Sequence, residues 1–462
     1  MEGMQAAEYV SGLMARARAA QKVIEYYSQE QVDELVTAIA WAGVEPGNAD
    51  RISKKAVEES KLGYYDAKYS KLQKKIRGAL RDIKHAKSVG VIEVDEARGL
   101  RKIAKPVGVI GAIVPCTNPE ATPFIKAMFA IKARNAVVFS PHPRSKETNM
   151  LIVDIMRGVL KKYGAPEDLL ISVDQVSIDI SGEVMKQCDL VVATGGSPMV
   201  KAAYSSGKPA YGVGVGNAVV VVDETADLAD AAHKIKLSKT FDYATSCSSE
   251  NSLVVQETVY GKLLSLLQSE GGYLCSADEK AQLQAVMWPD GEHLNTKIVA
   301  QPASAIAQLA GIKLGEDKSF LMVEETGVGK AHPFSGEKMS VVVTIYQYKE
   351  FTDAVAKVNE ITGYMGRGHS CGIHSTNDGH ILELSLLTKT SRVMVRQPQC
   401  YANSGDWVNG MPFTLTLGCG TWGGNISSEN ISLKHFYNTT WVAYPITPQI
   451  PSDEELFGDL AK

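Results

Sequence analysis

Hydrophobic positions in the first sixty residues recur at the spacing of a helix. Val10, Leu13 and Met14 would share one face, and the segment 28–31 reads Ser-Gln-Glu-Gln, the pattern of a capping box at a helix start. Helices are therefore predicted over residues 6–60. Because this amphipathic stretch runs directly into further helices, we expect it to be packed into the fold; a compartment-targeting tag is the alternative.

A different period follows between residues 88 and 105, where two strand-like runs flank the turn sequence Asp-Glu-Ala-Arg-Gly. This arrangement predicts a β-hairpin. The run 107–114 is apolar throughout, as is typical of a buried parallel strand, and strands then alternate with helices as far as residue 222. The order predicts a doubly wound α/β unit. Its strands are expected at 136–139, 169–173 and 190–193, and its helices at 150–163 and 181–187.

The alternation continues through the second half of the chain, from the apolar run 253–255 to a last strand-like run at 440–444. At 462 residues the chain exceeds the usual size of one domain. Two or three α/β domains are therefore expected.

The composition excludes several classes of function. Lys and Arg number 48 and Asp and Glu 52, a formal net charge of -4, so we expect no partnership with nucleic acid or an anionic membrane. The seven cysteines form no C-x-x-C pair, so neither a disulfide framework nor a metal site is predicted. Without a membrane-spanning apolar run or a signal-peptide pattern, the expected location is the cytoplasm.

One cysteine has the surroundings of a nucleophile. Cys247 lies in a run of small polar residues between a helix-like segment, 231–239, and the strand-like run 253–255. Such a loop lets a thiol approach a carbonyl group and be solvated as the thiolate, which is the attacking species. A buried structural thiol is the alternative.

Two predicted strands end in loops that suit a nucleotide. The first loop, 140–145, reads Ser-Pro-His-Pro-Arg-Ser, and the second, 194–197, reads Thr-Gly-Gly-Ser. In an open parallel sheet, ligands bind beyond the carboxyl ends of the strands, and glycines at a helix start let a phosphate approach backbone N–H groups. The pair of glycines is not the G-x-G-x-x-G fingerprint and also suits an ordinary turn.

Motifs spread along the chain carry a more specific resemblance. They occupy residues 106–119, 140–144, 193–196, 200–207, 247–250, 337–338 and 417–425. In this order, from about residue 10 to about residue 440, the chain resembles the CoA-acylating aldehyde dehydrogenases. The resemblance implies an α/β aldehyde dehydrogenase fold in three parts. These are a Rossmann-like cofactor domain at 1–235, an α/β catalytic domain at 236–425, and a return segment with an oligomerisation tail at 426–462.

The resemblance also implies an oligomer. The hairpin 88–105 and the strand near Trp441 would form an oligomerisation arm. Because a projecting hairpin has unpaired edges, a homodimer or homotetramer is expected.

The chemistry implied by the resemblance centres on Cys247. Its sulfur would attack the aldehyde carbon, and Asn118 with the Cys247 N–H would hold the oxyanion. Hydride would pass to NAD or NADP, and CoA, as co-substrate, would take the acyl group. His369 is a candidate for proton transfer or CoA contact, since imidazole titrates near neutral pH; a structural histidine is the alternative.

The implied nicotinamide cofactor has its own set of residues. Glu337 matches the family glutamate associated with the nicotinamide ribose, with a surface carboxylate as the alternative. Arg144 and Lys146 could pair with a 2′-phosphate, which leaves NAD and NADP both open. The predicted cofactor-binding residues are Ser140, Pro141, His142, Arg144, Thr194, Gly195, Gly196, Gly214 and Glu337.

The lack of a carboxylate near Val213 favours CoA as the acyl acceptor. Hydrolysing relatives carry a glutamate near the position of Val213 that activates water. The segment 212–216 here reads Gly-Val-Gly-Val-Gly and holds no carboxylate. Hydrolysis of a thioester should therefore be slow, and a thiol can accept the acyl group instead.

Further motifs narrow the expected substrate. Segments 245–252, 325–329, 332–338 and 451–458 resemble the branch of the family that acts on sulfoacetaldehyde. The hydroxyls of Thr245 and Ser246 could donate hydrogen bonds to a sulfonate. Arg392 and Arg396 are candidates for the opposing charge, since guanidinium suits oxyanions; a surface role is the alternative.

Three other hypotheses remain open from the sequence. Succinate semialdehyde or acetaldehyde could be the substrate of the same acylating reaction. A catalytically silent binding protein of the same fold is a hypothesis of another class, against which Cys247, Asn118 and Glu337 speak together.

Overall fold

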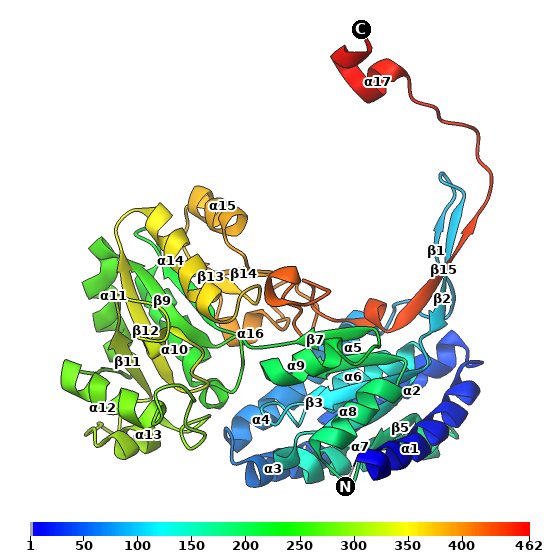
Figure 1. Ribbon diagram of the computed structural model, residues 1–462, viewed down its shortest axis with the longest axis horizontal. Coiled ribbons are helices and arrows are strands. Elements are labelled where there is room, and N and C mark those ends of the chain that lie inside the picture. The colour runs from blue at the N-terminus through cyan, green and yellow to red at the C-terminus, as the bar shows by residue number, and fades with distance from the viewer. Residues whose placement is uncertain (1–2) are drawn as a thin grey trace.

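The chain folds into two α/β lobes, each built on a sheet of parallel strands, and an antiparallel arm that projects from them (Figure 1). The computed structural model describes residues 3–462. Within that range no helix is both long and apolar enough to span a membrane. The predicted α/β class is confirmed.

The first lobe contains a five-stranded sheet with the strand order β5-β4-β3-β6-β7. Neighbouring strands are parallel throughout, and every residue of β3 and β4 is buried. Helices cover both faces of the sheet (Figure 1), which is why these strands are continuous apolar runs. The strands are β3 (Val109–Val114), β4 (Ala136–Pro141), β5 (Leu170–Ser172), β6 (Leu190–Thr194) and β7 (Ala210–Val213).

The N-terminal helices belong to this lobe and pack on its surface. Helix α1 buries a stripe that includes Val10, Leu13 and Met14, and α2 starts with the predicted capping box at Ser28. The packed role expected for residues 6–60 is therefore confirmed.

The helices of the first lobe are α1 (Gly3–Ile24), α2 (Gln29–Val44), α3 (Pro46–Ser60), α4 (Tyr65–Lys71), α5 (Arg77–Ile83), α6 (Thr122–Lys132), α7 (Lys146–Lys162), α8 (Ile178–Gln187) and α9 (Ser197–Tyr204).

Helices α4 and α5 form one continuous rod, joined by the π-helical turn η1 (Leu72–Ile76). The residues at both junctions, Lys71 and Arg77, keep helical backbone angles. A π-helical turn inside a helix often marks a functional site. We refer to residues 65–83 below as the α4–α5 rod.

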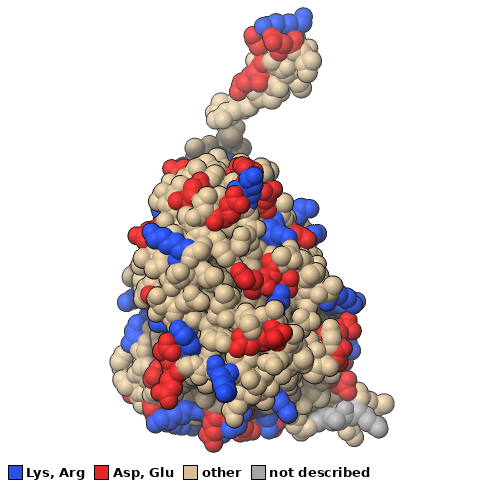
Figure 2. Space-filling view, turned by 90° about the vertical axis from the view of Figure 1, so that its left-hand side faces the viewer, with Lys and Arg blue, Asp and Glu red and all other residues tan. Residues whose placement is uncertain are grey.

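The second lobe contains a seven-stranded parallel sheet with the strand order β10-β11-β12-β9-β8-β13-β14. The strands are β8 (Ala218–Val222), β9 (Glu250–Gln256), β10 (Gly272–Leu274), β11 (Phe320–Glu324), β12 (Val342–Tyr348), β13 (Cys371–His374) and β14 (Val393–Val395). The helices are α10 (Leu228–Thr240), α11 (Glu257–Ser269), α12 (Ala277–Met287), α13 (Ala303–Ala310), α14 (Phe351–Tyr364), α15 (Asp378–Leu387) and α16 (Gln399–Ala402). On the face shown in Figure 2, acidic and basic side chains are interspersed.

The predicted domain boundaries at residues 235 and 425 need correction. Strand β8 pairs with β9 and β13, so the second sheet already begins at residue 218. On the return, Phe413 and Ile431 are buried in the core of the first lobe. The sequence misplaces the first boundary because β8, a buried run of alanine and valines, looks the same whichever sheet it joins.

The arm is a three-stranded antiparallel sheet with β2 (Leu100–Pro106) between β1 (Gly90–Asp95) and β15 (Tyr437–Ala443). The predicted hairpin and its pairing with the tail strand are therefore confirmed. Beyond β15 the exposed tail carries a short helix, α17 (Asp453–Phe457), which lies away from both lobes (Figures 1 and 2).

Candidate active site

The loop that carries Cys247 has a strained backbone. It connects α10 to β9, and its residues Asp242, Tyr243 and Ala244 have φ values of 50°, 50° and 62°. This left-handed region is unfavourable for residues other than glycine, so the surroundings must hold it in place. Strain of this kind gathers at functional sites, and here it ends three residues before Cys247.

Asp242 is held by a buried cluster of four charges. Its Oδ2 lies 2.7 Å from Lys68 Nζ and 2.5 Å from Lys71 Nζ, and Lys71 Nζ also lies 3.0 Å from Glu120. Burial alone would raise the pKa of Asp242, but the two ammonium groups outweigh it and hold the pKa below its usual value. Two cations therefore balance two carboxylates, which makes their burial tolerable.

The thiol of Cys247 meets a neutral histidine. His369 Nε2 lies 3.2 Å from Cys247 Sγ, and Nδ1 lies 2.8 Å from Ser370 Oγ. Burial, together with the nearby Arg392 guanidinium, lowers the pKa of His369 to about 3. Burial, with the charge of Glu337 acting in the same direction, raises the pKa of Cys247 to about 12. The resting pair is thus a thiol beside a neutral imidazole, which can accept the thiol proton as sulfur attacks.

Asn118 has a fixed amide orientation. Its Oδ1 accepts a hydrogen bond of 2.7 Å from Lys71 Nζ, while its Nδ2 makes only a long contact, 3.4 Å, with Thr117 Oγ1. Lys71 thus joins Asn118 to the cluster around Asp242. Because the oxygen faces Lys71, the NH₂ group is the part left to donate to a ligand near Cys247.

Two cavities meet at Cys247. The larger has a volume of about 630 Å³ and the smaller of about 40 Å³. Both are lined by Asn118, Thr245, Cys247, Leu415 and Leu417. The nucleophile and its amide therefore stand where a ligand in one cavity can reach a ligand in the other.

The larger cavity lies at the carboxyl ends of the strands of the first lobe, as expected for a ligand site in a parallel sheet. Every predicted cofactor residue except Arg144 lines it: Ser140, Pro141, His142, Thr194, Gly195, Gly196, Gly214 and Glu337. The Arg144 guanidinium instead donates to the backbone carbonyl of Ser60.

Glu337 faces this cavity from the second lobe. Its Oε1 accepts a hydrogen bond of 3.2 Å from the Gly216 N–H, and burial raises the pKa of the carboxyl to about 8. Among the described residues that line the larger cavity, Glu337 is the one carboxylate, and none is Lys or Arg. Val213 lines the wall of the larger cavity and is buried. It is the position near which the sequence predicts no carboxylate that could activate water.

Glycine is required where the segment between β7 and β8 crosses the catalytic loop. A Cβ atom on Gly216 would lie 1.9 Å from the carbonyl oxygen of Cys247. A larger residue would push the two segments apart and move Cys247.

Neither predicted arginine lines either of the two cavities at Cys247. The Arg392 guanidinium is buried and donates to the carbonyls of His369 and Gly418, each at 2.8 Å, and Arg396 donates to the carbonyl of Ser375 at 3.1 Å. These contacts do not support the prediction that the two arginines oppose a sulfonate, which stays a prediction.

The hydroxyls beside Cys247 are not equivalent. Thr245 Oγ1 donates a hydrogen bond of 2.6 Å to Asp242, so its proton is not free for a substrate, contrary to the prediction. Ser246 lines the smaller cavity, and its Oγ only accepts a bond of 3.3 Å, from the Ser248 N–H. Ser246 thus retains a donor.

Sequence reasoning missed the cations of the site. Lys71, Lys74 and Lys75 line the smaller cavity from the α4–α5 rod. The signal was available as a spacing of three and four residues, which places side chains on one helix face. In the sequence, this spacing looks the same as that of lysines on a solvent-exposed face of a helix.

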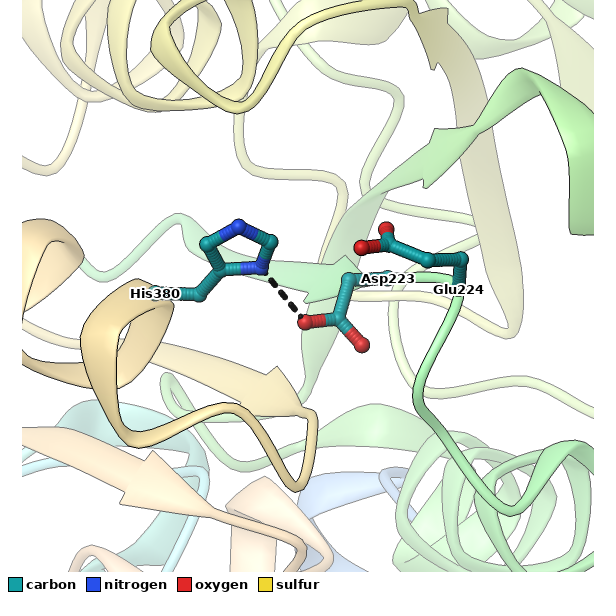
Figure 3. Close-up of side chains that lie close together, drawn as sticks. All are labelled: Asp223, Glu224 and His380. Carbon is teal, nitrogen blue, oxygen red and sulfur yellow. Dashed lines mark hydrogen bonds and ion pairs between the residues drawn. The ribbon is translucent and has the colours of Figure 1, made fainter.

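A separate polar cluster in the second lobe contains Asp223, Glu224 and His380 (Figure 3). Asp223 already accepts hydrogen bonds at both oxygens, from Thr225, Ser375 and His380 Nδ1, the last at 2.9 Å. These contacts tie α15 to the end of β8. We therefore assign the cluster a structural role.

Cys247 thus lies at the junction of a cavity large enough for a nucleotide and a much smaller one. The sequence model of the aldehyde dehydrogenase family matches residues 4–315. The chain belongs to this family.

Within the family, the similar proteins are acylating enzymes, as the motifs predict. The chain is 45% identical over 457 residues to a sulfoacetaldehyde dehydrogenase (acylating) of Cupriavidus necator, covering 98% of this chain and 92% of that protein. An acetylating aldehyde dehydrogenase from Geobacillus thermoglucosidasius superposes with a TM-score of 0.93 at 37% identity, covering 98% and 100% of the chains. A propionaldehyde dehydrogenase from Rhodopseudomonas palustris, with bound CoA and an acylated cysteine, gives 0.85 at 27%, covering 94% and 96%.

Proposed function

We propose that this enzyme oxidises sulfoacetaldehyde with NAD⁺ or NADP⁺ and transfers the acyl group to CoA, giving sulfoacetyl-CoA in a reversible reaction. The observation that carries the proposal is the position of Cys247 Sγ, 3.2 Å from a neutral imidazole and at the junction of two cavities. The 45% identity with an acylating sulfoacetaldehyde dehydrogenase supports the choice of aldehyde.

The first step uses residues of this chain alone. Cys247 Sγ attacks the carbonyl carbon of an aldehyde in the smaller cavity, and the thiol proton passes to His369 Nε2. The oxyanion of the tetrahedral adduct is held by Asn118 Nδ2, whose orientation Lys71 fixes, and by the Cys247 N–H. Loss of hydride from the adduct leaves a thioester on Cys247.

The larger cavity fits a nicotinamide dinucleotide. Gly196, the N-cap of α9, provides no side-chain cap; Pro198 has no N–H and the Met199 N–H donates to the Gly196 carbonyl, so the N–H groups of Gly196 and Ser197 remain for a phosphate. Thr194 and Gly195 would hold the same part of the cofactor, and Glu337 would accept hydrogen bonds from ribose hydroxyls. When bound, the cofactor supplies the hydride acceptor.

CoA rather than water takes the acyl group. The one carboxylate among the described lining residues of the larger cavity is Glu337, which is mainly protonated at neutral pH because burial raises its pKa to about 8. A protonated carboxyl cannot deprotonate water. Once His369 has released the first proton to solvent, the CoA thiol can lose its proton to His369 Nε2 and attack the thioester carbon. That proton then returns to the departing Cys247 thiolate, which restores the thiol.

We also propose that the arm joins copies of the chain into a homodimer or homotetramer. Its outer strands, β1 and β15, each leave one edge without a partner strand among the described residues. The exposed side chains on these strands include Val91, Val94 and Trp441. Exposed strand edges with apolar side chains favour association. A size measurement by light scattering, before and after deletion of residues 444–462, tests whether the tail adds to the contact.

We place the enzyme in the cytoplasm. All seven cysteines are free, and the reaction needs the thiol of Cys247. Both facts suit a reducing compartment.

A panel of aldehydes assayed with and without CoA, and with either nicotinamide, tests the proposed reaction. NAD(P)H absorbance should rise over many turnovers only when sulfoacetaldehyde and CoA are both present. Full-rate turnover without any thiol would refute the acylating mechanism. A higher kcat/KM for neutral aldehydes than for sulfoacetaldehyde would refute the substrate assignment.

A further inference from the structure

The smaller cavity presents an unusual distribution of charge. Its described lining residues include Lys71, Lys74 and Lys75 and no carboxylate. The three lysines are at positions i, i+3 and i+4 of the α4–α5 rod, so one face of the rod points all of them toward the cavity. The π-helical turn η1 spans Lys74 and Lys75. A cavity walled in this way favours an anionic ligand.

The three ammonium groups differ in how fully they are neutralised. Lys71 already contacts Asp242 and Glu120 and donates to Asn118, so its three protons are used. It positions the oxyanion donor and has nothing left for a substrate.

Lys74 and Lys75 are less neutralised. Lys74 Nζ contacts one carboxylate, Asp406, at 2.6 Å. Lys75 Nζ is buried and donates to the carbonyls of Tyr401, Ser404 and Gly405 at 3.1, 3.5 and 2.7 Å, so its three protons are used, and burial lowers its pKa to about 7. Lys74 is therefore the lysine of this cavity that is held by a single hydrogen-bonding partner and can turn to an incoming anion.

A second, independent observation points to a ligand in the same cavity. Ser248 is 1% exposed and lines the smaller cavity; among the described residues its Oγ has no oxygen or nitrogen partner and lies beside the Cys247 thiol, whose pKa it acts to lower. Ser246, on the other side of Cys247, retains a donor. A buried hydroxyl without an oxygen or nitrogen partner needs an explanation, and a bound group with several acceptor oxygens supplies one.

We propose that Lys74, with the hydroxyls of Ser246 and Ser248, forms the subsite that binds the anionic group of the aldehyde. This inference rests on the proposed function and assigns its charge selectivity to the α4–α5 rod. In sulfoacetaldehyde one carbon separates the carbonyl from the sulfonate. The anion must therefore lie close to Cys247, where the two serines flank the nucleophile. Three sulfonate oxygens can accept from both hydroxyls and from an ammonium group.

Asp406 makes the proposal sharply testable, because it competes with the substrate for Lys74. Its Oδ1 accepts a hydrogen bond from the Trp407 N–H and its Oδ2 contacts Lys74. Asp406→Asn keeps the first contact and removes the charge. If the ion pair only supported the fold, this change would weaken substrate binding. If Lys74 binds the substrate anion, the change should strengthen it.

The experiment compares wild type with Lys74→Met, Asp406→Asn and the double variant Lys74→Met/Asp406→Asn. Arg77→Gln is the matched control, since Arg77 is an exposed cation on the same rod. The first readout is the ratio of kcat/KM for sulfoacetaldehyde to that for propionaldehyde. The second is protection of Cys247 from iodoacetamide by ethanesulfonate, with ethyl methyl sulfone as the neutral probe.

Lys74→Met, alone and in the double variant, should lower the ratio by about ten- to a hundredfold, the range of one charge-assisted hydrogen bond. Asp406→Asn should increase protection by ethanesulfonate, and Arg77→Gln should change neither readout. Equal losses on both aldehydes in folded Lys74 variants would overturn the subsite. Wild-type Cys247 that ethanesulfonate fails to protect would overturn it too. Protection by ethanesulfonate in an enzyme that does not turn over sulfoacetaldehyde would refute the proposed function and retain the subsite.

Discussion

The two cavities on either side of Cys247 are opposites in size and charge. The larger, about 630 Å³, has one carboxyl group and neither Lys nor Arg among its described lining residues, whereas the smaller, about 40 Å³, has three lysines and no carboxylate. A large cavity lined by apolar groups and glycine backbone selects a ligand by shape. A small one lined by cations selects by charge. In the proposed function, specificity for the aldehyde and binding of the cofactor would therefore be encoded by separate parts of the chain that share Cys247 and Asn118.

The largest expected effect is at the shared nucleophile. Cys247→Ala should abolish acyl transfer, a loss on the order of a millionfold by analogy with other enzymes that lose their nucleophile. Binding of NAD(P)H, followed by its fluorescence, should persist, because the rest of the larger cavity is intact. Cys188→Ala and Cys275→Ala are the controls, since both thiols are buried away from either cavity. Near-normal turnover in folded Cys247→Ala would contradict the mechanism.

Asn118, which also lines both cavities, should affect every substrate alike. Asn118→Ala removes one oxyanion donor, which should lower kcat by about a hundred- to a thousandfold. Because Asn118 acts on the carbonyl oxygen and not on the sulfonate, the loss should be equal for sulfoacetaldehyde and propionaldehyde. Steady-state kinetics with both aldehydes checks this. A loss confined to the charged aldehyde would mean that Asn118 belongs to the charge-selective cavity alone.

The two cavities also differ in how readily their lining residues can be predicted from the sequence. The segments 140–144 and 194–196 lie at the ends of apolar strands, so a local pattern predicts that they line a ligand site, and all of these residues except Arg144 do. The smaller cavity is assembled from the α4–α5 rod, the Cys247 loop and the segment after α16. Only tertiary packing joins these segments.

The same reason explains why the cations that line the smaller cavity differ from those chosen from the sequence. Lys74 and Lys75 look like surface residues in the sequence, whereas Arg392 and Arg396 look like anion partners. In the structure, both arginines donate hydrogen bonds to backbone carbonyls of other segments. The fold of each lobe is predictable from strand periodicity, but β8 is not assignable to a sheet without its pairing partners.

The Cys247 thiol should have an unusually high pKa in the free enzyme. With the pKa of Cys247 raised to about 12, the thiolate fraction rises tenfold per pH unit at all lower pH. The rate of alkylation by iodoacetamide should therefore increase about a hundredfold between about pH 7 and pH 9 without a plateau. Mass spectrometry of the Cys247 peptide measures it. A plateau below about pH 8 would show that His369 and Cys247 rest as an ion pair instead of as neutral groups.

The smallest expected effect links the larger cavity to the nucleophile through Glu337. Its carboxyl has a pKa raised to about 8 by burial, so it gains its charge as the pH rises through that value. A carboxylate accepts ribose hydroxyls better than a protonated carboxyl does, so the Kd of NAD(P)⁺ should fall by up to about tenfold from pH 7 to pH 9. Glu337→Gln should flatten this dependence.

The same variant should also act on Cys247, because the negative charge of Glu337 helps to raise the pKa of the thiol. In Glu337→Gln the alkylation profile should shift toward lower pH by less than about one unit. His142 lines the same cavity but does not contribute to the raised pKa of Cys247. His142→Gln is therefore the control. An unshifted Cys247 profile in Glu337→Gln, together with a flat Kd, would mean that Glu337 faces the larger cavity without taking part in either binding or charge. In that case the two cavities would communicate through Cys247 and Asn118 alone.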